Sequence, residues 1–203
     1  MRKYIGSFDA TVKLWDTKSN AHKALMTLSE ARDSVSSLAV HGHEILAGSI
    51  DGRLRTYDIR MGQLNVDVLG YPITSISVTK YGDSVLVSNL DSTLRLMDRA
   101  NGKLLNAFRD GGEEGFVNKE YRIRSALGMH DSVVVSGSED GRVFIWDLVS
   151  GKVVHRLWHD EQGASATKGK KAVVSAVAFC KARKEWCSAG GNGEVVVWGM
   201  GER

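Results

Sequence analysis

Five short segments of this sequence resemble one another and recur at similar intervals. Each opens with a turn-forming Asp or Asn and closes with a large apolar residue, which an Asp follows in all but the last. The segments are 9–16 (DATVKLWD), 51–58 (DGRLRTYD), 91–98 (DSTLRLMD), 140–147 (DGRVFIWD) and 192–199 (NGEVVVWG). Their closing positions, Trp15, Tyr57, Met97, Trp146 and Trp198, are 42, 40, 49 and 52 residues apart. Such a period indicates that one supersecondary unit is repeated and that neighbouring units share a core.

A period near 40 residues that ends in Trp-Asp is typical of the WD-repeat β-propeller. Several runs are apolar on both strand faces, among them 133–135, 143–146 and 195–198. Sheets with both faces covered need not alternate apolar and polar residues. Because no amphipathic helix is visible, the sheets must cover one another as radially stacked blades, with the Trp positions between them. The sequence therefore predicts an all-β fold.

We expect four antiparallel strands in each complete unit, from innermost to outermost. For the second unit they are 35–40, 44–49, 53–58 and 64–69, and for the third they are 73–78, 84–89, 93–98 and 103–108. Asp-Gly and Asn-Gly pairs such as 51–52, 140–141 and 192–193 suit tight hairpins between the second and third strands.

The unit boundaries predict one domain, 1–203, that is part of a propeller with about four and a half blades. The first blade lacks its inner strand and the last lacks its outer strand. The blades are expected at about 1–30, 31–70, 71–109, 120–160 and 172–200, with surface loops at 110–119 and 161–171.

The composition is that of an ordinary globular chain. Of 203 residues, 42% are hydrophobic and 25% are charged, and the net charge of +3 gives no strong attraction to nucleic acid or to a membrane surface. Two cysteines, Cys180 and Cys187, are too few for a disulfide framework and predict reduced thiols. We expect a cytoplasmic and nuclear protein that takes no cofactor and no small-molecule substrate.

The repeated positions are interpreted as structural rather than catalytic. An acid at the start of each segment can accept backbone N–H groups of its turn, and one acid per blade does not provide a converging catalytic pair. The expected structural positions are Asp9, Trp15, Asp16, Asp51, Tyr57, Asp58, Asp91, Asp98, Asp140, Trp146, Asp147, Asn192 and Trp198.

The polar network of well-formed WD blades is expected to be incomplete. Its usual Gly-His pair is replaced by residues 32–33, 71–72 and 170–171. His155 and His159 are expected at solvated edge positions rather than as metal ligands, since a zinc site needs three or four converging ligands. The basic run 168–171 is expected to be a solvated loop rather than an RNA contact, because no aromatic platform accompanies it.

Partner contacts are predicted just before the inner strands, at the rim where propellers usually bind. The candidates are Arg32, Asp33, Tyr71, Tyr121, Arg122 and Arg124, since Arg and Tyr are enriched at binding hot spots. A separate candidate is Arg60, in the segment Tyr57-Asp58-Ile59-Arg60. That segment resembles the Trp-Asp-x-Arg box of substrate receptors for cullin-4 ubiquitin ligases, although a strand end followed by an exposed Arg is the simpler interpretation.

Several stretches resemble the mitogen-activated protein kinase organizer family of WD-repeat proteins. They are 28–37 (LSEARDSVSS), 43–64 (HEILAGSIDGRLRTYDIRMGQL), 91–98 (DSTLRLMD) and 136–152 (SGSEDGRVFIWDLVSGK). The resemblance implies a seven-bladed ring and a non-enzymatic scaffold that assembles components of a kinase cascade and is associated with pre-mRNA splicing. A ubiquitin-ligase substrate receptor is the alternative function. An enzyme is disfavoured, because no catalytic set of residues is visible.

Overall fold

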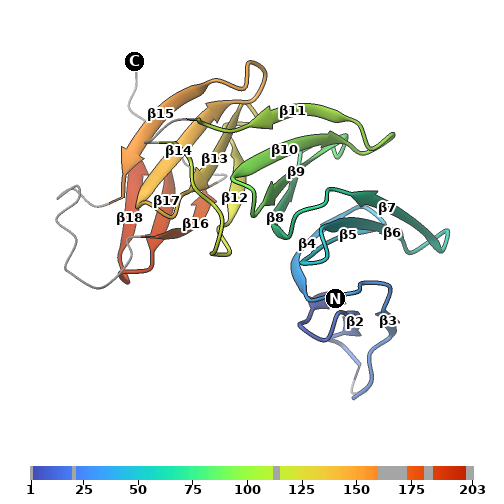
Figure 1. Cartoon of the computed structure of the whole chain (residues 1–203). Helices are drawn as coiled ribbons and strands as arrows, with labels where there is room; N and C mark the ends of the chain where they lie inside the picture. The colour runs from blue at the N-terminus through green and yellow to red at the C-terminus, as the bar shows by residue number, and fades with distance from the viewer. Residues whose placement is uncertain (1, 20–21, 112–114, 160–172, 181–184, 200–203) are drawn as a thin grey trace. The chain divides into compact units, whose positions relative to one another are not determined.

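The computed structural model describes residues 2–19, 22–111, 115–159, 173–180 and 185–199. These residues form 18 β-strands and no helix, arranged in five antiparallel sheets that we name A to E (Figure 1). The predicted all-β fold class is therefore confirmed. The chain divides into two compact units, Met1–Ile76 and Ser77–Arg203.

Sheets B, C and D each have four strands that pair in chain order. The strands predicted for sheets B and C agree with the structure to within one residue at either end. Sheet B contains β4 (Val35–His41), β5 (Glu44–Ser49), β6 (Arg53–Asp58) and β7 (Gln63–Val68). Sheet C contains β8 (Ile73–Val78), β9 (Ser84–Asn89), β10 (Thr93–Asp98) and β11 (Leu104–Phe108). Sheet D contains β12 (Ser125–Gly128), β13 (Val133–Gly137), β14 (Arg142–Asp147) and β15 (Val153–Trp158).

Sheets A and E have three described strands each. Sheet A contains β1 (Arg2–Gly6), β2 (Val12–Asp16) and β3 (Met26–Leu28), and sheet E contains β16 (Val174–Phe179), β17 (Glu185–Gly190) and β18 (Val195–Gly199). The whole of the predicted loop 161–171 lies outside the described residues, as do residues 112–114 of the predicted loop 110–119.

The hairpin turns at the start of the five repeated segments have left-handed backbone. Gly52, Gly141 and Gly193 supply it with φ values of 74°, 92° and 89°, a conformation that glycine adopts without a Cβ penalty. Ala10 in sheet A and Ser92 in sheet C occupy the same place with φ values of 62° and 58°. Those two turns are therefore strained relative to their counterparts.

The apolar cores lie between neighbouring sheets inside each unit. In unit Met1–Ile76, Val12 of sheet A packs with Val35, Ile45 and Tyr57 of sheet B. Burial and the nearby Glu30 raise the pKa of the Tyr57 hydroxyl to about 12, which fits a side chain that is 5% exposed in this core.

In unit Ser77–Arg203, Trp146 is fully buried between sheets C and D. Its ring stacks on Phe144 with centroids 5.6 Å apart and meets Phe116 edge-on at 5.3 Å. Trp186 and Trp198 stack in the same way in sheet E, at 5.2 Å. Such pairs add about 0.5–1.5 kcal/mol to the burial of the rings, so the closing aromatic residues hold the blades together.

The first two strands of sheet D approach the innermost strand of sheet E so closely that only glycine fits at two positions. A Cβ on Gly137 of β13 would lie 2.0 Å from the carbonyl oxygen of Val174 in β16. A Cβ on Gly128 would lie 2.3 Å from the ring of Phe179. Real side chains do not approach this closely, so these two glycines set the spacing of the sheets.

Candidate functional site

The six rim candidates all lie in segments that lead into inner strands, and all are exposed. Arg32 and Asp33 precede β4, Tyr71 precedes β8, and the remaining three precede β12. The first three belong to unit Met1–Ile76, and Tyr121, Arg122 and Arg124 belong to unit Ser77–Arg203. The structure therefore brings together the last three, in one loop of six residues, 119–124.

The loop 119–124 is held by one carboxylate. Oε1 of Glu139 accepts the backbone N–H groups of Lys119 and Glu120, each at 2.6 Å, and that of Tyr121 at 2.9 Å. Three donors on one oxygen fix the backbone as a cap fixes a helix end, and hydrogen bonds to a charged acceptor are stronger than neutral ones. Glu139 was not among the candidates, because its role depends on a loop 18 to 20 residues away.

Buried residues on both sides anchor the same loop. Asn118, which is fully buried, donates from Nδ2 to Oγ of Ser88 at 3.1 Å and to the carbonyl of Asn89 at 3.2 Å, both in sheet C. Ile123 is also fully buried, and the N–H of Arg124 donates to the carbonyl of Ser175 in sheet E at 2.9 Å. The loop backbone is thus fixed to sheets on either side while its Tyr and Arg side chains stay exposed.

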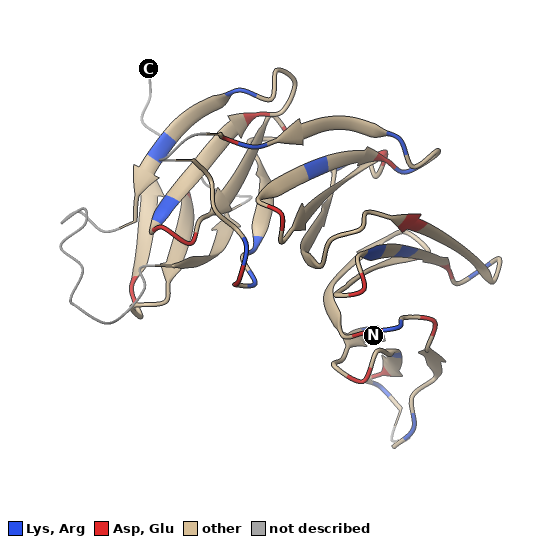
Figure 2. Cartoon of the chain, in the orientation of Figure 1, with Lys and Arg blue, Asp and Glu red and all other residues tan. Residues whose placement is uncertain are grey.

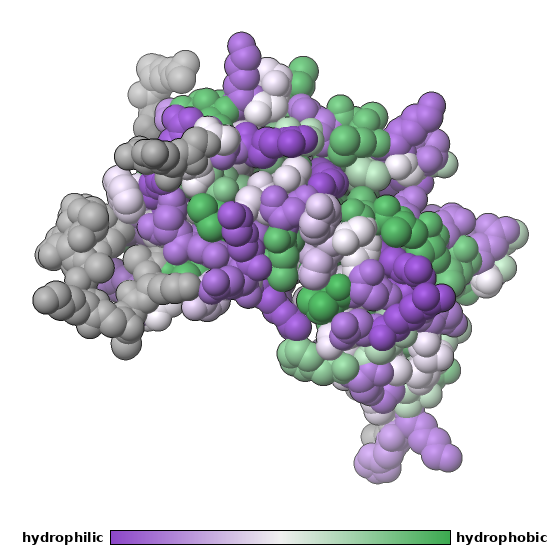
Figure 3. Space-filling model, in the orientation of Figure 1, coloured by the Kyte–Doolittle hydropathy of each residue, from purple (hydrophilic) through white to green (hydrophobic). Residues whose placement is uncertain are grey.

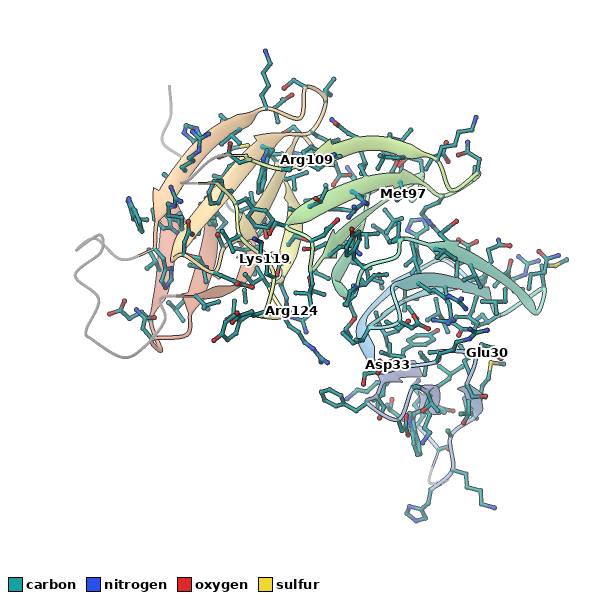
Figure 4. All side chains as sticks on the ribbon, viewed as in Figure 1. Glu30, Asp33, Met97, Arg109, Lys119 and Arg124 are labelled. Carbon is teal, nitrogen blue, oxygen red and sulfur yellow. The ribbon has the colours of Figure 1, made fainter. Side chains whose placement is uncertain are left out.

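The loop presents both signs of charge. Lys119 and Arg124, labelled in Figure 4, mark its two ends, and Figure 2 shows acidic and basic residues side by side where the chain enters β12. Hydrophobic and hydrophilic residues are likewise interspersed over the face in Figure 3. A mixed surface with Tyr and Arg suits contact with another protein better than contact with a uniformly charged polymer.

In unit Met1–Ile76, the rim segment is tied to the turn acid of sheet B. The N–H of Arg32 donates to Oδ2 of Asp51 at 3.1 Å. Burial alone would raise the pKa of Asp51, but hydrogen bonds from Arg55, Ser49 and the Arg32 backbone lower it to about 2. The carboxylate therefore stays charged at neutral pH.

Arg60 lies away from these residues. It is exposed and follows Asp58 at the end of β6, whereas Asp51 and the rim segment lie at the start of β6. Oδ1 of Asp58 accepts the N–H of Arg60 at 2.8 Å and that of Met61 at 3.0 Å. These bonds lower the pKa of Asp58, the Met61 bond most. Arg60 is thus one exposed residue of a capped turn at the opposite end of sheet B.

In sheets B and C, an arginine from the third strand completes the polar cluster at the turn acid. Arg55, which is 2% exposed, donates to Oγ of Ser49 at 2.7 Å and to Oδ2 of Asp51 at 2.7 Å. Arg95 donates to Oδ1 of Asn89 at 3.0 Å and to Oδ2 of Asp91 at 2.5 Å. A planar guanidinium can bind both oxygens of a carboxylate, which suits a buried pair.

Sheet E is built differently, and here one expectation was wrong. His159 is 4% exposed, not solvated. Its Nδ1 lies 2.8 Å from Oγ of Ser188, which also accepts the indole N–H of Trp198 at 2.8 Å. Its Nε2 lies 3.3 Å from the carbonyl of Glu194. A carbonyl can only accept, so Nε2 carries the proton.

Sequence reasoning misplaced His159 because it sought the histidine of the blade's polar network immediately before the inner strand, at 170–171. His159 instead follows β15 directly, and residues 160–172 separate it from β16. The sequence signal that could have identified His159 as a buried network residue was its position directly after Trp158, at the end of a fourth strand. The basic run 168–171 lies outside the described residues.

An apolar cavity of about 640 Å³ lies between sheets D and E. Its lining includes Leu157 of β15 and the rings of Phe179, Trp186 and Trp198. Within the described part of the chain, no group of three or more His, Cys, Asp or Glu residues could hold a metal ion. No helix among those residues is long and apolar enough to cross a membrane.

Comparison with known proteins gives matches to a repeat family, to a solved structure and to curated relatives. The family model described as "WD domain, G-beta repeat" matches residues 125–147, which run from β12 through β14. A crystal structure of the computationally designed Ika8 protein aligns with 98% of this chain and 55% of its own, with a TM-score of 0.72. Its sequence identity of 24% means that this likeness shows the fold alone. The sheets and these matches give the chain the fold class of a WD-repeat β-propeller.

Within that class, the chain is similar to proteins named WD repeat domain-containing protein 83. The Rattus norvegicus protein is 48% identical over 140 residues, which are 69% of this chain and 43% of the relative. The Dictyostelium discoideum homolog is 30% identical over 182 residues, 76% of this chain and 54% of the relative. The chain thus spans about half the length of these relatives or less.

Proposed function

We propose that this chain is a non-enzymatic protein-interaction scaffold that binds partners through the residues before its inner strands. The observation that carries the proposal is the loop 119–124. Its backbone is fixed by Glu139, Asn118 and Ile123 while Tyr121 and Arg122 remain exposed. A preorganised loop with exposed Tyr and Arg loses little entropy on binding, which is the condition for a binding hot spot.

A scaffold acts by proximity rather than by chemistry. Two partners held on one chain experience a raised effective concentration of each other, without a new contact between them. In unit Ser77–Arg203, blades that are packed through buried aromatic rings provide a platform for such binding, because close-packed cores resist deformation.

The proposed partners are components of a mitogen-activated protein kinase cascade or of the spliceosome. This part of the proposal is supported by the similarity to WD repeat domain-containing protein 83 and by the resemblance to the kinase organizer family. With partners of these two kinds, we propose that the protein is located in the cytoplasm and the nucleus. Arg32, Asp33 and Tyr71 are proposed as further contacts.

The experiment is affinity capture from nuclear and cytosolic extracts on the purified chain, read by quantitative mass spectrometry. The test variant is Tyr121→Ser/Arg122→Ser/Arg124→Ser, which keeps the backbone bonds of the loop. The matched control is Arg60→Ala, which changes an exposed arginine just after β6 of sheet B, outside the loop 119–124. We expect the test variant to lose kinase-cascade or splicing proteins at least 10-fold and the control to retain them.

Two results would contradict the proposal. One is that the unaltered chain recovers neither class of protein, and the other is that the triple variant recovers them equally well. The same experiment examines the ubiquitin-ligase alternative, whose one support is the exposed Arg60. Capture of a cullin-4 adaptor that Arg60→Ala abolishes would favour that alternative.

A further inference from the structure

Sheet E has an apolar face that stays exposed in the described part of the chain. Trp186 and Trp198 pack in the core that this sheet shares with sheet D, and side chains alternate between the two faces of a strand. The other face, which we name the outer face of sheet E, is formed by Ala178, Cys187, Val195 and Val197. Val195 is 65% exposed and Val197 is 69% exposed, so two aliphatic side chains are left in water.

The equivalent face of sheet D shows what kind of surface such a face binds. Val134 pairs with Trp146 in sheet D as Trp186 pairs with Trp198 in sheet E. By this register, the residues of sheet D that are equivalent to the outer face of sheet E are, in the same order, Ala126, Val135, Val143 and Ile145. All four lie in the core that Trp186 and Trp198 close. A face of this composition therefore receives aromatic rings from another sheet.

The closing aromatic residue of a sheet lies on the face that makes this contact. Tyr57, Trp146 and Trp198 pack in the cores that sheets B, D and E share with sheets A, C and D, respectively. In each case the ring points towards the preceding sheet. The outer face of sheet E is thus suited to a sheet whose own closing ring is directed at it.

Sheet A carries such a ring on the face that points away from sheet B. Gly6 and Val12 face sheet B, so the alternate residues of β1 and β2 lie on the opposite face. That face, which we name the outer face of sheet A, is formed by Lys3, Ile5, Lys13 and Trp15. Ile5 is 51% exposed. Sheet A therefore presents a closing ring together with an exposed aliphatic side chain.

The two outer faces also carry opposite charges. Lys3, which is exposed, and Lys13 lie on the outer face of sheet A. Glu185 lies two residues before Cys187 in β17, so it lies on the outer face of sheet E. Opposite charges around an apolar contact favour one partner and one orientation over others.

We propose that the outer face of sheet A in one copy of the chain binds the outer face of sheet E in a second copy. The contact is heterologous because the two faces differ, and a dimer formed in this way keeps one face of each kind for further copies. The inference stands independently of the loop 119–124 and of the function proposed above.

The test is sedimentation velocity of the whole chain over a range of concentrations. We expect the average mass to rise with concentration. Val197→Glu and Ile5→Glu should each weaken this self-association about 10-fold or more, because each places a charge within an apolar contact. Glu185→Lys should weaken it most at low salt. The control is Val149→Glu, which should have no effect, since Val149 is 87% exposed and follows β14, outside both faces.

Mixing two variants distinguishes this contact from one between identical faces. The Val197→Glu chain keeps the outer face of sheet A intact, and the Ile5→Glu chain keeps that of sheet E. Each variant alone should stay monomeric, whereas their equimolar mixture should form a one-to-one dimer and nothing larger, which also shows that both are folded. The proposal is overturned if the unaltered chain is monomeric at every concentration, if Ile5→Glu associates as tightly as the unaltered chain, or if the mixture forms no dimer.

Discussion

Single residues decide how each blade satisfies its buried polar atoms. The turn acid of each segment was identifiable from the repeat, but the group that donates to it was not. Arg55 and Arg95 lie four residues after Asp51 and Asp91. This spacing predicts a contact only when the conformation of the hairpin turn is known. His159 was missed because the residues 160–172 interrupt its spacing from β16.

The Ser188 hydroxyl provides a direct test of the network in sheet E. Ser188→Ala leaves the indole N–H of Trp198 and the ring of His159 without their shared partner, and burying unsatisfied polar groups costs about 1–3 kcal/mol. We expect a loss of that size in the free energy of unfolding, measured with urea.

Ser136 is the matched control, because it occupies the equivalent place in sheet D. Its hydroxyl donates to the carbonyl of its neighbour Gly137, and the indole nitrogen of Trp146 has no partner among the described residues. Ser136→Ala should therefore cost clearly less than Ser188→Ala. Equal losses would contradict the network.

At the scale of strands and sheets, sequence reasoning was most successful. Alternating turn and apolar signals predicted the strands of sheets B and C to within one residue, because hairpin turns with Asn, Asp and Gly fix both ends of a strand. The close approach of β13 to β16 could not be predicted. Gly137 looks like any other strand glycine until the partner strand, 37 residues further along, is placed against it.

Gly137→Ala is expected to destabilise the chain by at least about 1–3 kcal/mol, since a new methyl group would overlap the backbone of β16. Backbone cannot rotate away as a side chain can. Gly199→Ala is the control, because a Cβ there meets nothing within 4 Å. The measurement is thermal unfolding followed by circular dichroism. A melting temperature for Gly137→Ala equal to that of Gly199→Ala would show that the sheets are further apart.

For the molecule as a whole, response to acid follows from its carboxylates. A hydrogen bond from the Thr11 side chain is the main cause that lowers the pKa of Asp9 to about 2, and the bonds to Asp51 lower its pKa to about 2 as well. Asp58, Asp83 and Asp147 shift in the same direction. Burial raises the pKa of Asp67 and opposes them.

A carboxyl group whose pKa is lower in the folded state than in the unfolded chain stabilises the fold above its unfolded value, here 3.8. We therefore expect the free energy of unfolding to decline as the pH falls from about 4 towards 2, while Asp67 acts in the opposite direction at higher pH. Asp51→Asn should be less stable than the unaltered chain at pH 7, and the difference should shrink over the same interval. Urea unfolding at several pH values measures both. If the difference in the free energy of unfolding stays constant down to pH 2, Asp51 does not contribute to the loss of stability in acid.

The source of each buried donor has a consequence for the order in which the blades form. Arg55 and Arg95 come from the same hairpin as the carboxylates that they bind, so sheets B and C can complete their polar clusters by closing a few residues of chain. His159 follows the last strand of sheet D but binds Ser188 in sheet E. Sheet E thus depends on a contact that spans 29 residues, and contacts of long sequence separation form late because their loop entropy must be overcome first. A blade that carries its own arginine completes its polar cluster within one hairpin, whereas the cluster of sheet E forms only once the end of sheet D lies against it.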